Sequence, residues 1–209
     1  MIFVELFASQ GALTAEQRRR VGQDLVAAVM PAQEGAPAEA VAGARAYTQV
    51  VIHEPETWFV GGISTAPPEQ PRYVVRITVP VAWRKEMSPM IIPAITRVLA
   101  KSERDPTRLH NVPHAWIQIM GIPEGSYGIF GRPQTTTDIV RLITQPYRDG
   151  DEEGRTGELP PGTALDPVCG MTVPLDNAFR VVEADGITYA FCANACHTIF
   201  EQERQTATQ

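Results

Sequence analysis

Apolar positions in residues 1–144 form the same succession of patterns twice. In each half, a continuous apolar run, typical of a buried strand, precedes a segment with helical spacing and then a second apolar run. The first half places strands at residues 2–8 and 47–52, and the second half places them at residues 73–81 and 115–120. The pattern therefore predicts two consecutive strand–helix–strand repeats.

Each repeat also carries a signal for the start of its helix. Thr14 and Gln17 are three residues apart, which is the spacing of a capping box that satisfies the first N–H groups of a helix. In the second repeat, Ser88 followed by Pro89 predicts a helix start. Pro93 is expected to bend this helix or to delay its start, because proline lacks the N–H group that a helix interior uses.

The two repeats predict an α+β fold. A strand–helix–strand unit normally forms a right-handed crossover between parallel strands, so two units give a four-stranded sheet with both helices on one face. The order of the elements alone does not decide between a ferredoxin-like fold and a tautomerase-like fold.

The composition of the chain changes after residue 144. Residues 145–165 contain several acidic residues, several glycines and the pair Pro160–Pro161, and they offer almost nothing to bury. This composition predicts a flexible linker between a first domain at residues 1–144 and a second at residues 166–209. A long surface loop of one domain is the alternative.

The second domain is expected to be a β-hairpin followed by a helix. Two short β-prone runs, residues 179–183 and 187–191, are joined by Asp185 and Gly186, which favour a type I′ turn. A helix is then expected to begin at Cys192 and to end near residue 205.

All three cysteines of the chain, Cys169, Cys192 and Cys196, lie in this second domain. Cys192 and Cys196 are four residues apart, so a helix places both thiols on one face, and a helix N-terminus favours the thiolate that binds metals. An odd number of cysteines in one short segment predicts a metal site rather than disulfides. Three buried free thiols in a small core are the alternative.

The chemistry of the ligands narrows the choice of metal to Cu(I) or Zn(II), one ion per chain. Three thiolates suit trigonal Cu(I), whereas structural Zn(II) usually has a fourth ligand. Met171 either adds a thioether, which favours Cu(I), or belongs to the core. His197 is a donor by type, but its position next to Cys196 turns it about 100° around the helix.

Residues 166–205 resemble the YHS and related TRASH-type domains. The shared features are the opening DPVCGM and the ending F-C-x-x-x-C-x-x-x-F, which runs from Phe191 to Phe200. The Tyr-His-Ser string of the family is absent, since Ala190 and Phe191 follow Tyr189. The resemblance implies binding of copper or another thiophilic ion in transport, sensing or delivery.

Residues 1–144 resemble a fused pair of 4-oxalocrotonate tautomerase units. The shared features are VELF near the start, the T-x-E-Q helix opening and, after the closing strand of each half, an aromatic residue with a glycine shortly behind it. These aromatic residues are Trp58 and Tyr127. The resemblance implies a trimer in which short hairpins after each unit dock onto neighbouring subunits.

The same resemblance implies a catalytic N-terminal proline, but Ile2 stands at the matching position. Met1 would supply only a primary amine, with a reference pKa of about 7.7–8.0. Arg84 either binds a substrate carboxylate, as arginines of the family do, or is a solvent-facing loop charge beside Lys85. With only Met1 and Arg84 as catalytic candidates, we expect a scaffold without the usual chemistry of the family.

Charge and hydropathy limit the partners. The net charge of −6 and the pI of about 5.3 argue against nucleic acid and acidic membranes. No apolar stretch reaches the roughly 18 residues of a membrane span, and the N-terminus lacks the charged region of a signal peptide. We expect a cytoplasmic homotrimer that stores, delivers or senses a soft metal and exchanges it with a protein partner.

Two other functions fit the sequence. The first is an isomerase or related enzyme that acts on a small carboxylate and whose second domain is regulatory or structural. The second is a C-terminal domain that binds a protein and holds a metal only to stabilise its fold.

Overall fold

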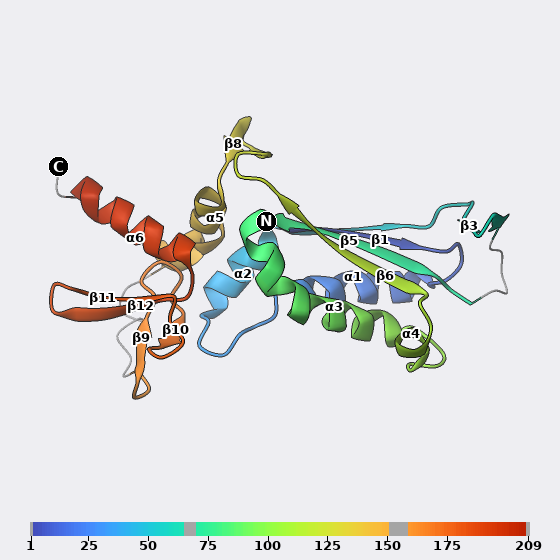
Figure 1. Ribbon diagram of the computed structural model, residues 1–209, viewed down its shortest axis with the longest axis horizontal. Helices are drawn as coiled ribbons and strands as arrows, with labels where there is room; N and C mark the ends of the chain where they lie inside the picture. Colours follow the sequence, from blue (N-terminus) through green and yellow to red (C-terminus); the bar gives the residue numbers. More distant parts are fainter. Residues whose placement is uncertain (1, 65–69, 151–158, 208–209) are drawn as a thin grey trace. The chain divides into compact units, whose positions relative to one another are not determined.

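The computed structural model describes residues 2–64, 70–150 and 159–207, which form two compact units (Figure 1). The first unit consists of Met1–Pro31 and Thr48–Pro123, and the second consists of Ala32–Tyr47 and Glu124–Gln209. The chain therefore enters the second unit twice, first between two elements of the first unit and again after residue 123.

A four-stranded sheet with the strand order β2-β1-β5-β6 forms the first unit. Its strands are β1 (Ile2–Ala8), β2 (Thr48–His53), β5 (Tyr73–Pro80) and β6 (Ala115–Ile122). Within each repeat the two strands pair directly and in parallel, and the repeats meet where β1 and β5 run antiparallel. In a ferredoxin-like sheet another strand separates the two strands of each unit, so the pairing excludes that alternative.

The helices α1 (Ala15–Val29) and α3 (Arg84–Ala100) cover one face of this sheet, as Figure 1 shows. Alternate residues of β1 are fully buried, because successive side chains of a strand point to opposite faces. They pack against buried residues of the two helices, and each such side chain contributes about 1.5–3 kcal/mol on burial. The buried residues are Ile2, Val4, Leu6 and Ala8 of β1, Val21, Leu25 and Val29 of α1, and Ile91, Ile95 and Leu99 of α3. The predicted α+β fold is thereby confirmed.

One of the two predicted helix starts is correct. Thr14 and Gln17 form the reciprocal capping box, with N···O distances of 3.1 and 2.8 Å. The predicted start at Ser88 is wrong, because a 3₁₀ turn, η1 (Val81–Trp83), leads directly into α3 at Arg84. Pro89 and Pro93 lie inside the helix, where packing of its apolar face onto the sheet outweighs the two missing N–H groups.

Shorter elements complete the first unit. The hairpin β3 (Phe59–Val60) with β4 (Ile63–Ser64) follows β2, and a single helical turn, α4 (Arg108–Asn111), precedes β6. The short hairpin that was expected after the first repeat is thus present.

In its described residues, the second unit combines a small sheet with three helices. The sheet order is β10-β9-β12-β11, and a separate hairpin joins β7 to β8. The strands are β7 (Tyr127–Ile129), β8 (Arg132–Gln134), β9 (Thr163–Leu165), β10 (Thr172–Pro174), β11 (Arg180–Ala184) and β12 (Ile187–Phe191), and the helices are α2 (Ala38–Ala46), α5 (Thr136–Arg148) and α6 (Asn194–Ala207). Asp185 and Gly186 both have positive φ, 54° and 75°, as the predicted hairpin turn requires.

The domain boundaries expected from the sequence remain a prediction. Within the expected linker, residues 145–165, the helix α5 continues to Arg148 and the strand β9 begins at Thr163, while residues 151–158 lie outside the described residues. Tyr147 is buried, which explains why the helix runs past residue 144. None of the helices in the described part of the chain is long and apolar enough to span a membrane.

Candidate metal centre

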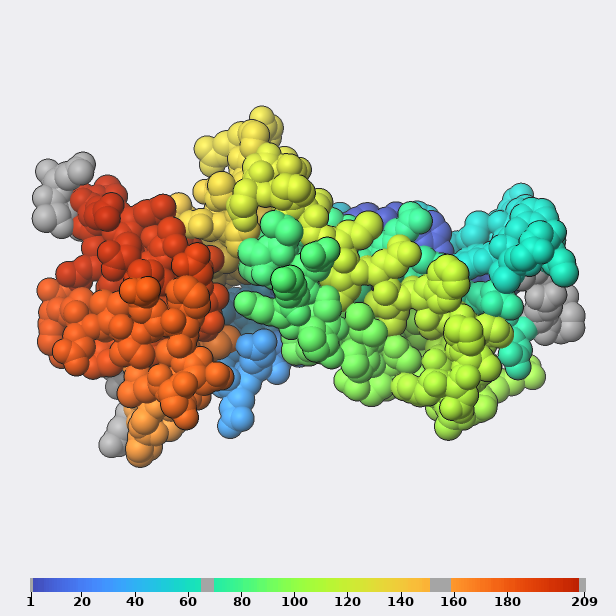
Figure 2. All heavy atoms as spheres, in the orientation of Figure 1, coloured from blue at the N-terminus to red at the C-terminus, as the bar shows by residue number. Residues whose placement is uncertain are grey.

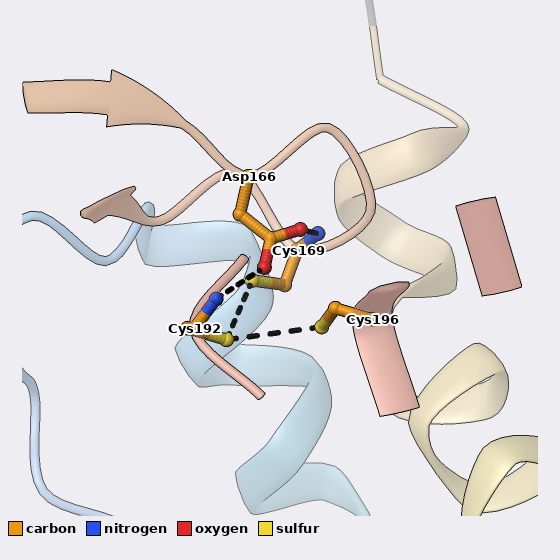
Figure 3. A group of neighbouring side chains, drawn as sticks. All are labelled: Asp166, Cys169, Cys192 and Cys196. Carbon is orange, nitrogen blue, oxygen red and sulfur yellow. Dashed lines mark hydrogen bonds between the residues drawn. The ribbon is translucent and has the colours of Figure 1, made fainter. Parts of the chain in front are cut away.

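Three separate parts of the second unit bring the cysteines together (Figure 3). Cys169 lies in the tight loop of residues 166–171, which we call the cysteine loop and which connects β9 to β10. Cys192 directly follows β12, and Cys196 lies in the first turn of α6. The Cys169 and Cys192 sulfurs are 3.6 Å apart, and those of Cys192 and Cys196 are 3.7 Å apart. All three are free thiols.

Asp166 is the fourth member of this group, and its side chain is fully buried. Its Oδ1 accepts hydrogen bonds from the N–H groups of Val168 (3.0 Å) and Cys169 (3.3 Å). Its Oδ2 accepts a hydrogen bond from the N–H of Cys192 (3.0 Å). One carboxylate therefore joins two cysteine-bearing segments that are more than 20 residues apart in sequence.

Backbone hydrogen bonds close the cysteine loop upon itself. The N–H of Asp166 donates to the carbonyl oxygen of Met171, and the N–H of Gly170 donates to the carbonyl oxygen of Asp166, both at 2.8 Å. Gly170 has φ of +74°, a conformation that residues with a Cβ rarely adopt. The loop is thus a compact structure that holds the Cys169 sulfur toward the other two.

Of the three thiols, that of Cys169 loses its proton most readily. Hydrogen bonds from Cys192 and Cys196 lower the pKa of Cys169 to about 5, because the two S–H groups stabilise its thiolate. Donation to Cys169 raises the pKa of Cys192 to about 12 and also raises the pKa of Cys196. Burial raises the pKa of Asp166 to about 6. A metal ion that binds all three sulfurs must therefore displace the two remaining S–H protons.

The ligand atoms of Asp166, Cys169, Cys192 and Cys196 all lie within 4.8 Å of one another, which is close enough for a single ion. Three sulfurs and one carboxylate oxygen form a mainly soft ligand set. Such a set suits thiophilic ions, and Mg²⁺ or Ca²⁺ prefer oxygen ligands throughout.

No protein-family model matches the chain, and no curated protein sequence matches it. Solved structures resemble it over about two thirds of its length. A native fused 4-OT is 21% identical and covers 63% of this chain and 94% of its own, with a TM-score of 0.45. A fused 4-OT described as a wild-type asymmetric trimer is 16% identical, with the same coverages and a TM-score of 0.47. The macrophage migration inhibitory factor of Toxoplasma gondii is 14% identical and covers 63% of this chain and 98% of its own, with a TM-score of 0.44.

The other predicted metal ligands occupy different surroundings. Met171 is partly buried and packs against Ala164, Val173 and Ala190 in the core of the small sheet. The ring of His197 meets the ring of Phe191 edge-on at 5.2 Å, and its Nε2 is 3.8 Å from a carboxylate oxygen of Glu201. These packing contacts favour structural roles for both residues.

Only one of the two catalytic candidates belongs to the described residues. Arg84 is the exposed first residue of α3, and Met1 lies outside the described residues. Ile2, which takes the position of the catalytic proline in the tautomerase resemblance, is fully buried at the start of β1.

Sequence reasoning missed the role of Asp166. An aspartate two or three residues before backbone N–H groups in a tight loop is a known turn former, so the segment Asp166–Pro167–Val168–Cys169 contained a usable signal. The contact with Cys192 had no such signal, because it depends on the folded hairpin that separates the two residues.

Proposed function

We propose that the protein binds one thiophilic metal ion through Cys169, Cys192 and Cys196, and that it stores, delivers or senses this ion. The observation that carries the proposal is the convergence of three free sulfurs, 3.6–3.7 Å apart in consecutive pairs, at a buried carboxylate. Free thiols that only fill a core do not require a carboxylate whose oxygens fix the backbone of two of them. This arrangement supports a YHS-like or TRASH-like role for residues 166–205.

The ligand set supports Cu(I) or Zn(II). Three thiolates are sufficient for trigonal Cu(I), and a carboxylate oxygen of Asp166 would complete the four ligands of tetrahedral Zn(II). In either case the chain supplies the ligands, of which Asp166, Cys169 and Cys196 are buried and Cys192 is partly buried.

Metal content tests this proposal. Protein purified under reducing conditions is expected to take up about one Cu(I) or Zn(II) per chain, measured by elemental analysis after gel filtration. Replacing any one cysteine by serine should weaken binding severely, because a hydroxyl group is a poor ligand for a soft ion. His197→Ala is the matched control in the same helix and should bind nearly as much metal. Full uptake by a variant that lacks all three thiols would refute the proposal.

We further propose that the first unit is a tautomerase-like scaffold that forms a homotrimer. Its sheet has an open face on which apolar side chains remain exposed, among them Val51 (39%), Trp116 (62%) and Met120 (41%). Val51 lies on the edge strand β2, and Trp116 and Met120 lie on the opposite edge strand β6, so apolar side chains are exposed at both edges of this face. Exposed apolar surface commonly marks a contact with another protein chain. We propose that several metal sites are displayed on one assembly, in the cytoplasm, and that they exchange metal with a protein partner.

The assembly is expected to have three times the 22.9 kDa mass of one chain, measured by light scattering. Trp116→Arg should lower this mass, because it places a charge on the open sheet face. Ile187→Arg is the matched control, since Ile187 is also exposed (52%) but belongs to the hairpin of the second unit. A wild-type protein that is monomeric would contradict the trimer.

An isomerase activity has less support. The buried Ile2 leaves no proline amine at the start of β1, and Arg84 is exposed at the first residue of α3. We therefore propose that the scaffold displays the metal sites and does not catalyse the reactions of tautomerases.

A further inference from the structure

A segment that is distant from the cysteines in sequence contacts the cysteine loop. Residues Ala32–Tyr47 connect α1 to β2, yet they belong to the second compact unit. The N–H of Thr172, the first residue of β10, donates to the carbonyl oxygen of Gly35 at 2.8 Å. In Figure 2 the blue atoms of this segment lie beside the orange atoms of the cysteine-bearing part. The residue that directly follows the cysteine loop is therefore hydrogen-bonded to the α1–β2 connection.

Two glycines allow the cysteine-bearing segment and the α1–β2 connection to approach each other closely. A Cβ at Gly170, next to Cys169, would overlap the ring of Tyr147 in α5 and would lie 2.8 Å from Cγ of Pro37, the N-cap residue of α2. A Cβ at Gly35 would lie 2.8 Å from the carbonyl oxygen of Thr172. Both glycines have positive φ, +74° and +79°. The cysteine loop thus packs tightly against the start of α2 and the end of α5.

The helices α2 and α5 are themselves in close contact. A Cβ at Gly43 of α2 would overlap the backbone carbonyl oxygen of Ile143 in α5. The cysteine loop, α5 and α2 therefore form one packed set, in which α2 has little freedom to move away while the loop stays in place.

We propose that metal occupancy of the cysteine site is coupled to the order of the α1–β2 connection, with Ala32–Tyr47 acting as a positioning element of the site. This inference rests on the proposed metal-binding function. A metal that binds only the closed loop stabilises every segment that opens together with it. Because linkage is reciprocal, an ordered Ala32–Tyr47 also raises the affinity of the cysteines for the metal. The order of the α1–β2 connection, which links two elements of the first unit, then depends on whether the metal site is occupied.

Hydrogen exchange of the full chain with and without Zn²⁺ tests the coupling. With free Zn²⁺ at about 100 times its dissociation constant, amides of α2 should exchange up to about 100-fold more slowly, if they exchange through the opening that exposes the cysteines. Amides of α3, which belong to the first unit, serve as the internal control and should not change. Stoichiometric zinc binding with unchanged exchange in α2 would overturn the coupling and leave the proposed function intact. A chain that binds neither Zn²⁺ nor Cu(I) would refute both.

A pair of glycine variants provides an independent test. Gly43→Ala should separate α2 from α5 and weaken the equilibrium affinity for Zn²⁺, measured by competition with a chelator, by at least about fivefold, the lower end of typical coupling between sites. Gly128→Ala in β7 is the control, because apart from the two adjacent residues of the chain no heavy atom lies within 4 Å of its Cβ position. Equal affinities for Zn²⁺ in the two folded variants would contradict the inference. If Gly43→Ala does not fold, the exchange measurement on the unmodified chain decides.

Discussion

Asp166→Ala is expected to abolish tight metal binding although all three cysteines remain. The substitution removes the acceptor of three backbone N–H groups, those of Val168, Cys169 and Cys192. A buried donor that loses its partner costs about 1–3 kcal/mol, so the cysteine loop and the residue after β12 should separate. The sulfur of Cys169 would then no longer be held beside that of Cys192.

Elemental analysis and chelator competition measure this loss. Asp176→Ala is the matched control, because Asp176 is an exposed aspartate of the same unit and should bind metal like the unmodified protein. Asp166→Asn should be intermediate, since its amide keeps one acceptor oxygen but directs an NH₂ group at a backbone N–H. Normal metal stoichiometry and normal resistance to a chelator in Asp166→Ala would show that Asp166 neither positions the cysteines nor binds the metal ion.

Arg108→Met is expected to destabilise the first unit by about 3–5 kcal/mol, because it leaves the buried carboxylate of Glu103 without its counter-ion. The two side chains are only 8% and 6% exposed, and the guanidinium contacts both carboxylate oxygens at 2.8 Å. Two further N–H groups of Arg108 bond to Nδ1 of His114 and to the carbonyl oxygen of Pro71, both at 2.9 Å. The hydroxyl of Tyr73 donates to the same carboxylate at 2.6 Å, and burial together with this bond raises the pKa of Tyr73.

Hydrogen exchange of β5 and β6 amides reports on this unit separately, which matters because one unfolding free energy is not defined for a chain of two units. Arg97→Met is the control: Arg97 is an exposed residue of α3, and its loss should change stability by less than about 0.5 kcal/mol. The double variant Glu103→Gln/Arg108→Met should recover part of the loss, because no buried charge then remains unpaired. Equal exchange in Arg108→Met and Arg97→Met would show that the ion pair does not stabilise the unit.

Local patterns were sufficient to predict much of the fold. The apolar run at residues 2–8, the capping box at Thr14 and the turn at Asp185 depend on neighbouring residues, and the structure contains the strand, the capping box and the turn that they predict. The helix α2 was missed because its Ala- and Gly-rich segment has no capping side chain and buries only Gly43. The helix α5 was missed although Thr135 and Asp138 form a capping box, because the polar residues after it predicted a linker.

Of the residues in the candidate site, only the three cysteines could be predicted from the sequence. The spacing of Cys169, Cys192 and Cys196 indicated a metal site, and the structure brings all three together. The bonds of Asp166, like those of Arg108 in the first unit, join residues whose proximity depends on the whole fold. A charged residue in such a position looks like a solvent-exposed loop charge when the sequence is read alone.

The double passage of the chain through the second unit also determines the order in which the protein can fold during synthesis. Residues 32–47 leave the ribosome more than a hundred residues before Thr172, to which Gly35 is hydrogen-bonded. At about 5–20 residues per second, the delay is about 6–25 s. During this time β1 can already pair with β2. The connection between α1 and β2 cannot yet form its hydrogen bond with Thr172. Until Thr172 is made, the α1–β2 connection therefore lacks the hydrogen bond between Gly35 and Thr172 and is accessible to proteases and chaperones.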